Sequence, residues 1–215
     1  MKKSLIFTAV CAAAALSAAD NGLIRNKLVA GETEEFRIVA NKPELFNRRP
    51  LDGSTVKMNC DKNNLYIKLE MADGDIISEA KENQSSLNRF GDAVRILLKP
   101  ADKSDLWEFV FSPNNLKSCF YHLGAGAMFY PLPGSEFPDF TVKNNIKNGV
   151  WKAEVTIPLS IFRAKGLKFD KSEKWHIMIV RRNFSRLHTQ PEVSSYPQAI
   201  GNVADPNYYA ELVIK

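Results

Sequence analysis

The sequence predicts an all-β protein, an antiparallel β-sandwich of the jelly-roll kind with about ten strands. Three observations lead to this prediction. Apolar residues recur with a period of two, turn-forming residues follow each run after a few positions, and almost no stretch has a helical period. Alternation with a period of two gives each strand one apolar face, and two sheets can bury such faces against each other.

The N-terminal segment is set apart from this pattern. A basic start, a short apolar run and a small-residue cleavage site follow one another in MKKSLIFTAVCAAAALSAA. The apolar run is shorter than the roughly 20 residues that cross a bilayer. We therefore predict a secretory signal peptide at residues 1–19, a single domain at 20–215, and a protein that is secreted or periplasmic.

The composition of the remaining chain limits its partners. It holds 215 − 19 = 196 residues, enough for one substantial core. No later apolar run is long enough to cross a membrane, so we expect no transmembrane segment after signal removal. The net charge of the full chain is +5 and is spread along the sequence, which predicts no nucleic-acid partner.

The strands follow in order, each with a turn signal behind it. The expected strands are Thr55–Cys60, Leu65–Ala72, a run within 91–100, one beginning at 105, a returning run within 116–124, Phe140–Asn145, Val150–Ile157, Trp175–Arg182 and the terminal 210–215. The first two are joined by Asp-Lys-Asn-Asn, whose side chains bond nearby backbone groups and favour turns. Residues 78–87 are polar and predict a loop or one short helix, and 124–138 predict a long Gly/Pro loop.

One strand, Val150–Ile157, allows a prediction of side-chain placement. We expect burial of Trp151, Val155 and Ile157 and exposure of Lys152 and Thr156. Pro158 lacks a backbone N–H and should end the pairing. The apolar residues that follow, Leu159, Ile161 and Phe162, then predict a short turn that caps the open end of the core. Trp107 and Trp175 also lead alternating faces and are expected in the core.

Two cysteines remain after signal removal, Cys60 and Cys119. An oxidising compartment would permit a disulfide between them. Each also lies in an expected strand, where a lone cysteine serves as a small buried apolar residue. The sequence leaves both alternatives open.

Five stretches, taken in order, resemble the family 9 carbohydrate-binding module and its β-sandwich relatives, the DOMON domains. They are NNLYIKLEMADGD, FGDAVRILLKP, VWKAEVTIPLSIF, WHIMIVRRNFSR and SSYPQAIGNVADPNYYAELVIK, and the likeness covers most of residues 55–215. The sequence departs from the family at Arg95, where a glutamate is common, and at Met178, where an asparagine is common. Phe90 and Tyr196 fall near positions where sugar-clamping members carry tryptophan.

The resemblance implies a carbohydrate ligand, and the residues present suit one. Aromatic rings offer flat faces to the C–H surfaces of sugars, and charged or amide groups bond their hydroxyls. The predicted sugar-binding residues are Phe90, Arg95, Tyr121, Arg181 and Tyr196. For each ring the alternative is core packing.

Acidic residues near two strand ends are candidate metal ligands. Asp73 and Asp75 flank Gly74, and Asp92 joins them if the loops meet. Hard cations take several oxygen ligands, and the resemblance implies a structural calcium ion here. The alternative is a plain solvated turn.

Catalysis is poorly supported by the sequence. No histidine lies in HExxH, no serine lies in GxSxG, and Glu108 and Glu154 have the outward phase of their strands, which predicts surface positions. We therefore predict an exported, non-catalytic carbohydrate-binding protein that assists polysaccharide recognition or breakdown beside a separate glycoside hydrolase.

Two other hypotheses remain. One is a haem-binding electron-transfer sandwich, which would draw its ligands from Met58, Met71, Met178, His122 and His176. The other is an exported protein-interaction module without a small ligand.

Overall fold

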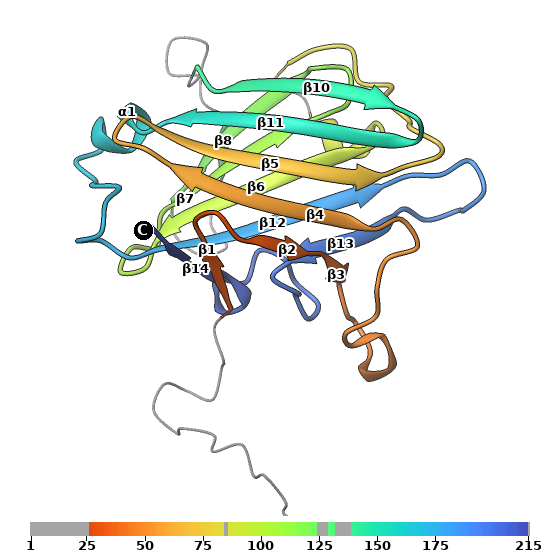
Figure 1. Cartoon of the computed structure of the whole chain (residues 1–215), viewed down its shortest axis with the longest axis horizontal. Helices are drawn as coiled ribbons and strands as arrows, with labels where there is room; N and C mark the ends of the chain where they lie inside the picture. The colour runs from red at the N-terminus through yellow and green to blue at the C-terminus, as the bar shows by residue number, and fades with distance from the viewer. Residues whose placement is uncertain (1–25, 84–85, 124–128, 132–138, 215) are drawn as a thin grey trace, which may run out of the picture.

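Two sheets packed face to face make up the described chain (Figure 1). The structure, a computed structural model, describes residues 26–83, 86–123, 129–131 and 139–214. The predicted signal peptide and most of the predicted Gly/Pro loop lie outside these residues. Among the described residues, no helix is long and apolar enough to cross a membrane.

The smaller sheet has the strand order β10-β11-β5-β4-β2, with every neighbouring pair antiparallel. Its strands are β2 (Thr33–Glu35), β4 (Ser54–Cys60), β5 (Asn64–Ala72), β10 (Thr141–Lys147) and β11 (Val150–Pro158). The predicted turn between β4 and β5 is confirmed. The Asp61 carboxylate accepts the backbone N–H groups of Asn63 and Asn64, both at 2.7 Å.

The larger sheet has nine strands in the order β1-β14-β12-β6-β7-β8-β9, with β13 beside β12 and β3 beside β13. Its strands are β1 (Lys27–Val29), β3 (Arg37–Ile38), β6 (Ala93–Pro100), β7 (Leu106–Phe111), β8 (Lys117–His122), β9 (Phe129–Pro131), β12 (Trp175–Asn183), β13 (Glu192–Tyr196) and β14 (Ala210–Val213). The pair β1 and β14 is parallel, and the other paired strands of this sheet run antiparallel.

The fold class is confirmed, with fourteen strands in the described chain where about ten were predicted. The additional strands are β1, β2, β3, β9 and β13. Four of them have two or three residues, which is too short for an alternating pattern to show in the sequence. Residues 87–89 form a 3₁₀ turn, η2 (Leu87–Arg89), within the region left open between loop and helix.

The predicted placement of the β11 side chains is confirmed in all but one position. Trp151, Val155 and Ile157 are buried and Lys152 is exposed, whereas Thr156 is half-buried. After Pro158 the chain forms the short helix α1 (Ser160–Arg163). Its Phe162 is fully buried, with ring centroids 5.2 Å from Trp107 and 4.6 Å from Trp175. The segment therefore caps the core, as predicted.

The outer face of the larger sheet is covered, which the sequence did not predict. All six residues of β7 are buried, although alternation predicted one exposed face. Ala199 and Tyr209, from the chain between β13 and β14, pack on this outer face with Leu97 and Met178. The strands of the larger sheet therefore bury side chains on both faces.

Among the described residues, no disulfide joins Cys60 and Cys119. Cys60 is half-buried on β4 of the smaller sheet, and Cys119 is buried on β8 of the larger sheet. Burial raises the pKa of the Cys60 thiol to about 11. Both residues therefore fit the alternative of small packing residues.

Candidate functional site

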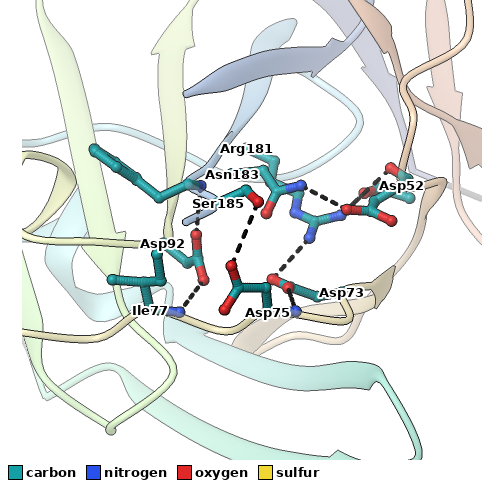
Figure 2. Close-up of polar contacts among 10 residues, drawn as sticks. Asp52, Asp73, Asp75, Ile77, Asp92, Arg181, Asn183 and Ser185 are labelled. Atoms are coloured by element: carbon teal, nitrogen blue, oxygen red, sulfur yellow. Dashed lines mark hydrogen bonds and ion pairs between the residues drawn. The ribbon is translucent and has the colours of Figure 1, made fainter. Parts of the chain in front are cut away.

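Four of the predicted site residues come together at one end of the sandwich (Figure 2). We call this group, Asp52, Asp73, Asp75, Asp92, Arg181 and Asn183, the aspartate–arginine cluster. Its centre is Arg181 of β12, which is fully buried. The Arg181 Nη2 lies 3.0 Å from Asp73 Oδ2, and its Nη1 donates to Ser54 Oγ at 2.9 Å. A buried guanidinium needs such a partner, so Arg181 and Asp73 hold each other in place.

Asp92 joins two loops at this end. Its Oδ2 accepts the backbone N–H of Ile77 and its Oδ1 accepts the backbone N–H of Phe184, both at 2.7 Å. The side chain is fully buried. Removal from water raises the pKa of Asp92 to about 7, and the nearby Asp73 charge adds to the increase.

The remaining members of the cluster are also engaged by protein groups. Asp75 accepts the backbone N–H of Arg186 at 2.7 Å and pairs with the Arg186 guanidinium. The backbone bond from Arg186 is the chief reason that the pKa of Asp75 is lowered. Asp52 Oδ2 accepts from Asn183 Nδ2 at 3.0 Å.

These contacts bear on the calcium prediction. Arginines neutralise Asp73 and Asp75, and both oxygens of Asp92 accept backbone N–H groups. Within the described part of the chain, no group of three or more His, Cys, Asp or Glu side chains is arranged to hold a metal. The residues therefore do not fit a calcium site without displacing their present partners. The solvated-turn alternative also fails for Asp73 and Asp92, because both are buried.

A groove of about 730 Å³ lies elsewhere on the molecule, beside Tyr196. Its lining combines aromatic rings, among them Phe46, Tyr196 and Tyr208, with the amides Asn47, Gln198 and Asn207. Gln198 Nε2 donates to the Ile38 carbonyl at 2.8 Å, and its Oε1 accepts the Asn47 N–H at 3.2 Å. The loop after β13 is therefore tied through Gln198 both to the loop that carries Phe46 and Asn47 and to β3.

Two of the predicted aromatic residues, Tyr196 and Phe90, line different hollows. Tyr196 is 8% exposed, packs in the core between the sheets, and donates its hydroxyl to the Lys27 carbonyl at 2.7 Å. Phe90 follows η2, is 48% exposed, and lines a separate hollow with residues 78–82. The ring most exposed in the groove beside Tyr196 is Phe46, at 54%. The sugar-binding roles of Phe90 and Tyr196 stay predictions, to be tested one residue at a time.

Arg95 belongs to a third polar group, on the covered outer face of the larger sheet. Its Nε lies 2.6 Å from Glu108 Oε1, and His122 Nε2 lies 2.9 Å from Glu108 Oε2. Glu108 is buried, so its predicted surface position is wrong, whereas Glu154 is exposed as predicted and pairs with Lys68. The error follows from the segments that cover this face, because they come from distant parts of the sequence.

Tyr121 lies at the edge of the core. Its ring centroid is 4.9 Å from that of Trp107, and its hydroxyl donates to Asp105 Oδ2 at 2.7 Å. The Lys165 ammonium lies 5.3 Å from the ring centroid. The ring is therefore packed on one side and half-exposed on the other.

The sequence did not predict that Phe46 and Gln198 line one groove. A signal was present, because FNRRP and YPQ set an aromatic ring beside an amide within turn-forming residues. The two stretches lie side by side only because of contacts between loops, and a local sequence pattern does not reveal such contacts.

The methionines of the haem hypothesis are dispersed. Met58 and Met71 are buried between the sheets, while Met178 lies on the outer face of the larger sheet. His122 is engaged by Glu108. The haem hypothesis stays untested, and no observation in the described chain favours it.

Comparison with known proteins adds the fold family. No family model matches the sequence, and no curated protein matches it. A solved structure of a proposed carbohydrate-binding protein from Bacteroides uniformis has a TM-score of 0.67 and 9% identity, over 89% of this chain and 97% of that one.

Two further solved structures show a family 9 carbohydrate-binding module from Caldicellulosiruptor kristjanssonii. The glucose complex has a TM-score of 0.58, over 88% of this chain and 96% of that one, and the cellotriose complex has 0.56, over 89% and 93%; both are 16% identical. At these identities the likeness shows the fold. The chain has the fold of a family 9 carbohydrate-binding module, as the resemblance implied, whereas the DOMON link stays a prediction.

Proposed function

We propose that the mature chain is an exported, non-catalytic carbohydrate-binding protein that holds its glycan in the groove beside Tyr196. The observation that carries the proposal is the chemistry of this groove. It sets exposed aromatic surface beside side-chain amides, at a volume of about 730 Å³. Rings suit the apolar faces of sugars, and amides both donate to and accept from hydroxyl groups.

The fold supports the same proposal. The modules from Caldicellulosiruptor kristjanssonii, which share this fold, are solved with glucose and with cellotriose. Proteins with the same fold can bind different ligands, so the proposal rests on the residues that line the groove. In the proposal the predicted signal peptide exports the chain, and a separate glycoside hydrolase acts on the glycan that it binds.

Phe46→Ala is the direct test of the groove. We expect the mature protein to bind a short oligosaccharide with a Kd on the order of 0.1–1 mM, since one exposed ring gives little stacking area. Loss of the Phe46 ring should weaken binding by about tenfold, or about 1.4 kcal/mol. The ring is 54% exposed, so its removal should leave the fold intact. Titration calorimetry over a glycan panel, with circular dichroism of each variant, measures both effects.

Phe90→Ala is the matched control, because Phe90 is a similarly exposed phenylalanine in a separate hollow. If the glycan lies in the groove, this variant should bind like the wild type, and the predicted sugar-binding role of Phe90 is then wrong. If Phe90→Ala loses binding and Phe46→Ala keeps it, the glycan lies at the Phe90 hollow and the groove assignment is wrong. If the wild type binds no glycan on the panel, the interaction-module hypothesis replaces the proposal.

A further inference from the structure

Glu34 stands out among the charged residues that line the groove beside Tyr196. It lies on β2, the edge strand of the smaller sheet, and is half-buried. In the described chain its carboxylate has neither a hydrogen bond nor an ion pair. Carboxylates that lose water without gaining a donor are unfavourable, so Glu34 is a candidate for a ligand contact.

The adjacent carboxylate differs in this respect. Glu35 Oε2 lies 2.9 Å from Arg37 Nη1 and 3.4 Å from Arg49 Nη2. Hydrogen bonding from Arg37 is the chief cause that lowers the pKa of Glu35. The two glutamates therefore share one groove, but only Glu35 already has cationic partners.

The surroundings of Glu34 destabilise its charged form, which leaves a cation to gain by binding there. Burial is the main cause that raises the pKa of Glu34, and the neighbouring Glu32 charge raises it further. Among the described groups, no cation and no hydrogen-bond donor offsets these two effects on the pKa of Glu34. The aromatic rings of the same groove present electron-rich faces, which also attract cations.

We infer that the groove selects glycans that carry a protonated amino group, with the Glu34 carboxylate as the partner of the ammonium. This inference rests on the proposed function and adds the class of sugar. A sugar is favoured over a basic peptide because the lining amides match ring hydroxyls. General attraction of a polycation is not expected, because the full chain has a net charge of +5.

The test compares four probes of similar length on the mature protein. They are an unacetylated glucosamine tetramer, its N-acetylated form, cellotetraose and tetralysine, each titrated at about pH 6, where amino groups are protonated. We expect the glucosamine tetramer to bind about five- to tenfold more tightly than the N-acetylated form. Glu34→Gln should remove this preference, and Glu35→Gln, whose carboxylate is already paired, should keep it.

The outcomes separate the inference from the proposed function. Equal binding of the neutral and amino tetramers in the wild type keeps carbohydrate binding and overturns the amino-sugar inference. Tetralysine binding as tight as that of the glucosamine tetramer also overturns it, because the groove is then a general cation site. If none of the three oligosaccharides binds, the proposed function and the inference both fall. The wild-type comparison needs no variant, so a folding defect in Glu34→Gln cannot hide the result.

Discussion

Trp151 is held by packing and by one hydrogen bond. The centroid of its ring lies 5.8 Å from that of Phe111, with the rings edge to face. Its Nε1 donates to Asn144 Oδ1 at 2.8 Å. The alternation of β11 predicted the burial of the ring. The hydrogen bond was not predictable, because it depends on how β10 pairs with β11.

Trp151→Ala should lower the free energy of unfolding by about 3–5 kcal/mol, through lost transfer energy and the cavity left behind. Urea denaturation followed by fluorescence or circular dichroism measures the change. Lys152→Ala is the neighbouring control. Lys152 is exposed and pairs with Glu70 at the surface, so its removal should cost less than about 1 kcal/mol. A Trp151→Ala variant as stable as Lys152→Ala would contradict the assigned burial.

At the scale of elements, the sequence predicts the strands that have a long alternating pattern. The strands β5, β11 and β12 lie close to their predicted bounds, because their patterns are local. The covered outer face of the larger sheet was missed, since the residues that cover it come from chain segments far from β6 and β7. The sequence predicts that Asp73, Asp75 and Asp92 lie together if their loops meet. It predicts Arg181 as a sugar-binding residue and gives no sign of its buried pairing with Asp73.

Asp92 connects the two loops that carry Ile77 and Phe184. Its ionisation should make the stability of the protein depend on pH. Its pKa rises in the folded protein from an ordinary value of 3.8 to about 7. The folded state therefore holds this proton more tightly than the unfolded state. The resulting stability is present below about pH 4 and is lost as the pH rises to about 7, by at most about 1.4 kcal/mol per pH unit.

Asp92→Asn should flatten this slope in urea denaturation curves recorded between about pH 4 and pH 7. It should also lower overall stability, because an amide has one oxygen for the two backbone N–H groups. Asp75→Asn is the control. The pKa of Asp75 is lowered, so its stabilising effect is lost only as the pH falls below its ordinary range. An unchanged slope in Asp92→Asn would assign the pH dependence to other groups.

At the scale of the whole molecule, the sandwich holds its acidic end together with its own cations. Arg181 and Arg186 neutralise Asp73 and Asp75 from within the chain. A structural calcium ion at this end, which the family resemblance implies, would have to displace these partners. The fold therefore has a means of balancing the charge without an added metal.

Calcium should accordingly have little effect on thermal stability. We expect the melting temperature of the mature protein to shift by less than about 2 °C between a chelator and millimolar calcium, since the change in unfolding free energy is small. Differential scanning calorimetry measures this shift. A rise of several degrees with calcium, absent from an Asp73→Asn, Asp75→Asn double variant, would instead establish the calcium site.

The parallel pairing of β1 with β14 has a consequence for assembly. Leu28 lies opposite Leu212, so an early strand of the chain closes the sheet against a very late one (Figure 1). A ribosome makes β1 long before β14, and β1 has no sheet partner until then. The sandwich therefore stays open during synthesis, with β1 as an unpaired edge that a chaperone can hold. If the chain is exported as proposed, such delayed closure would let it cross the membrane before the sheet forms.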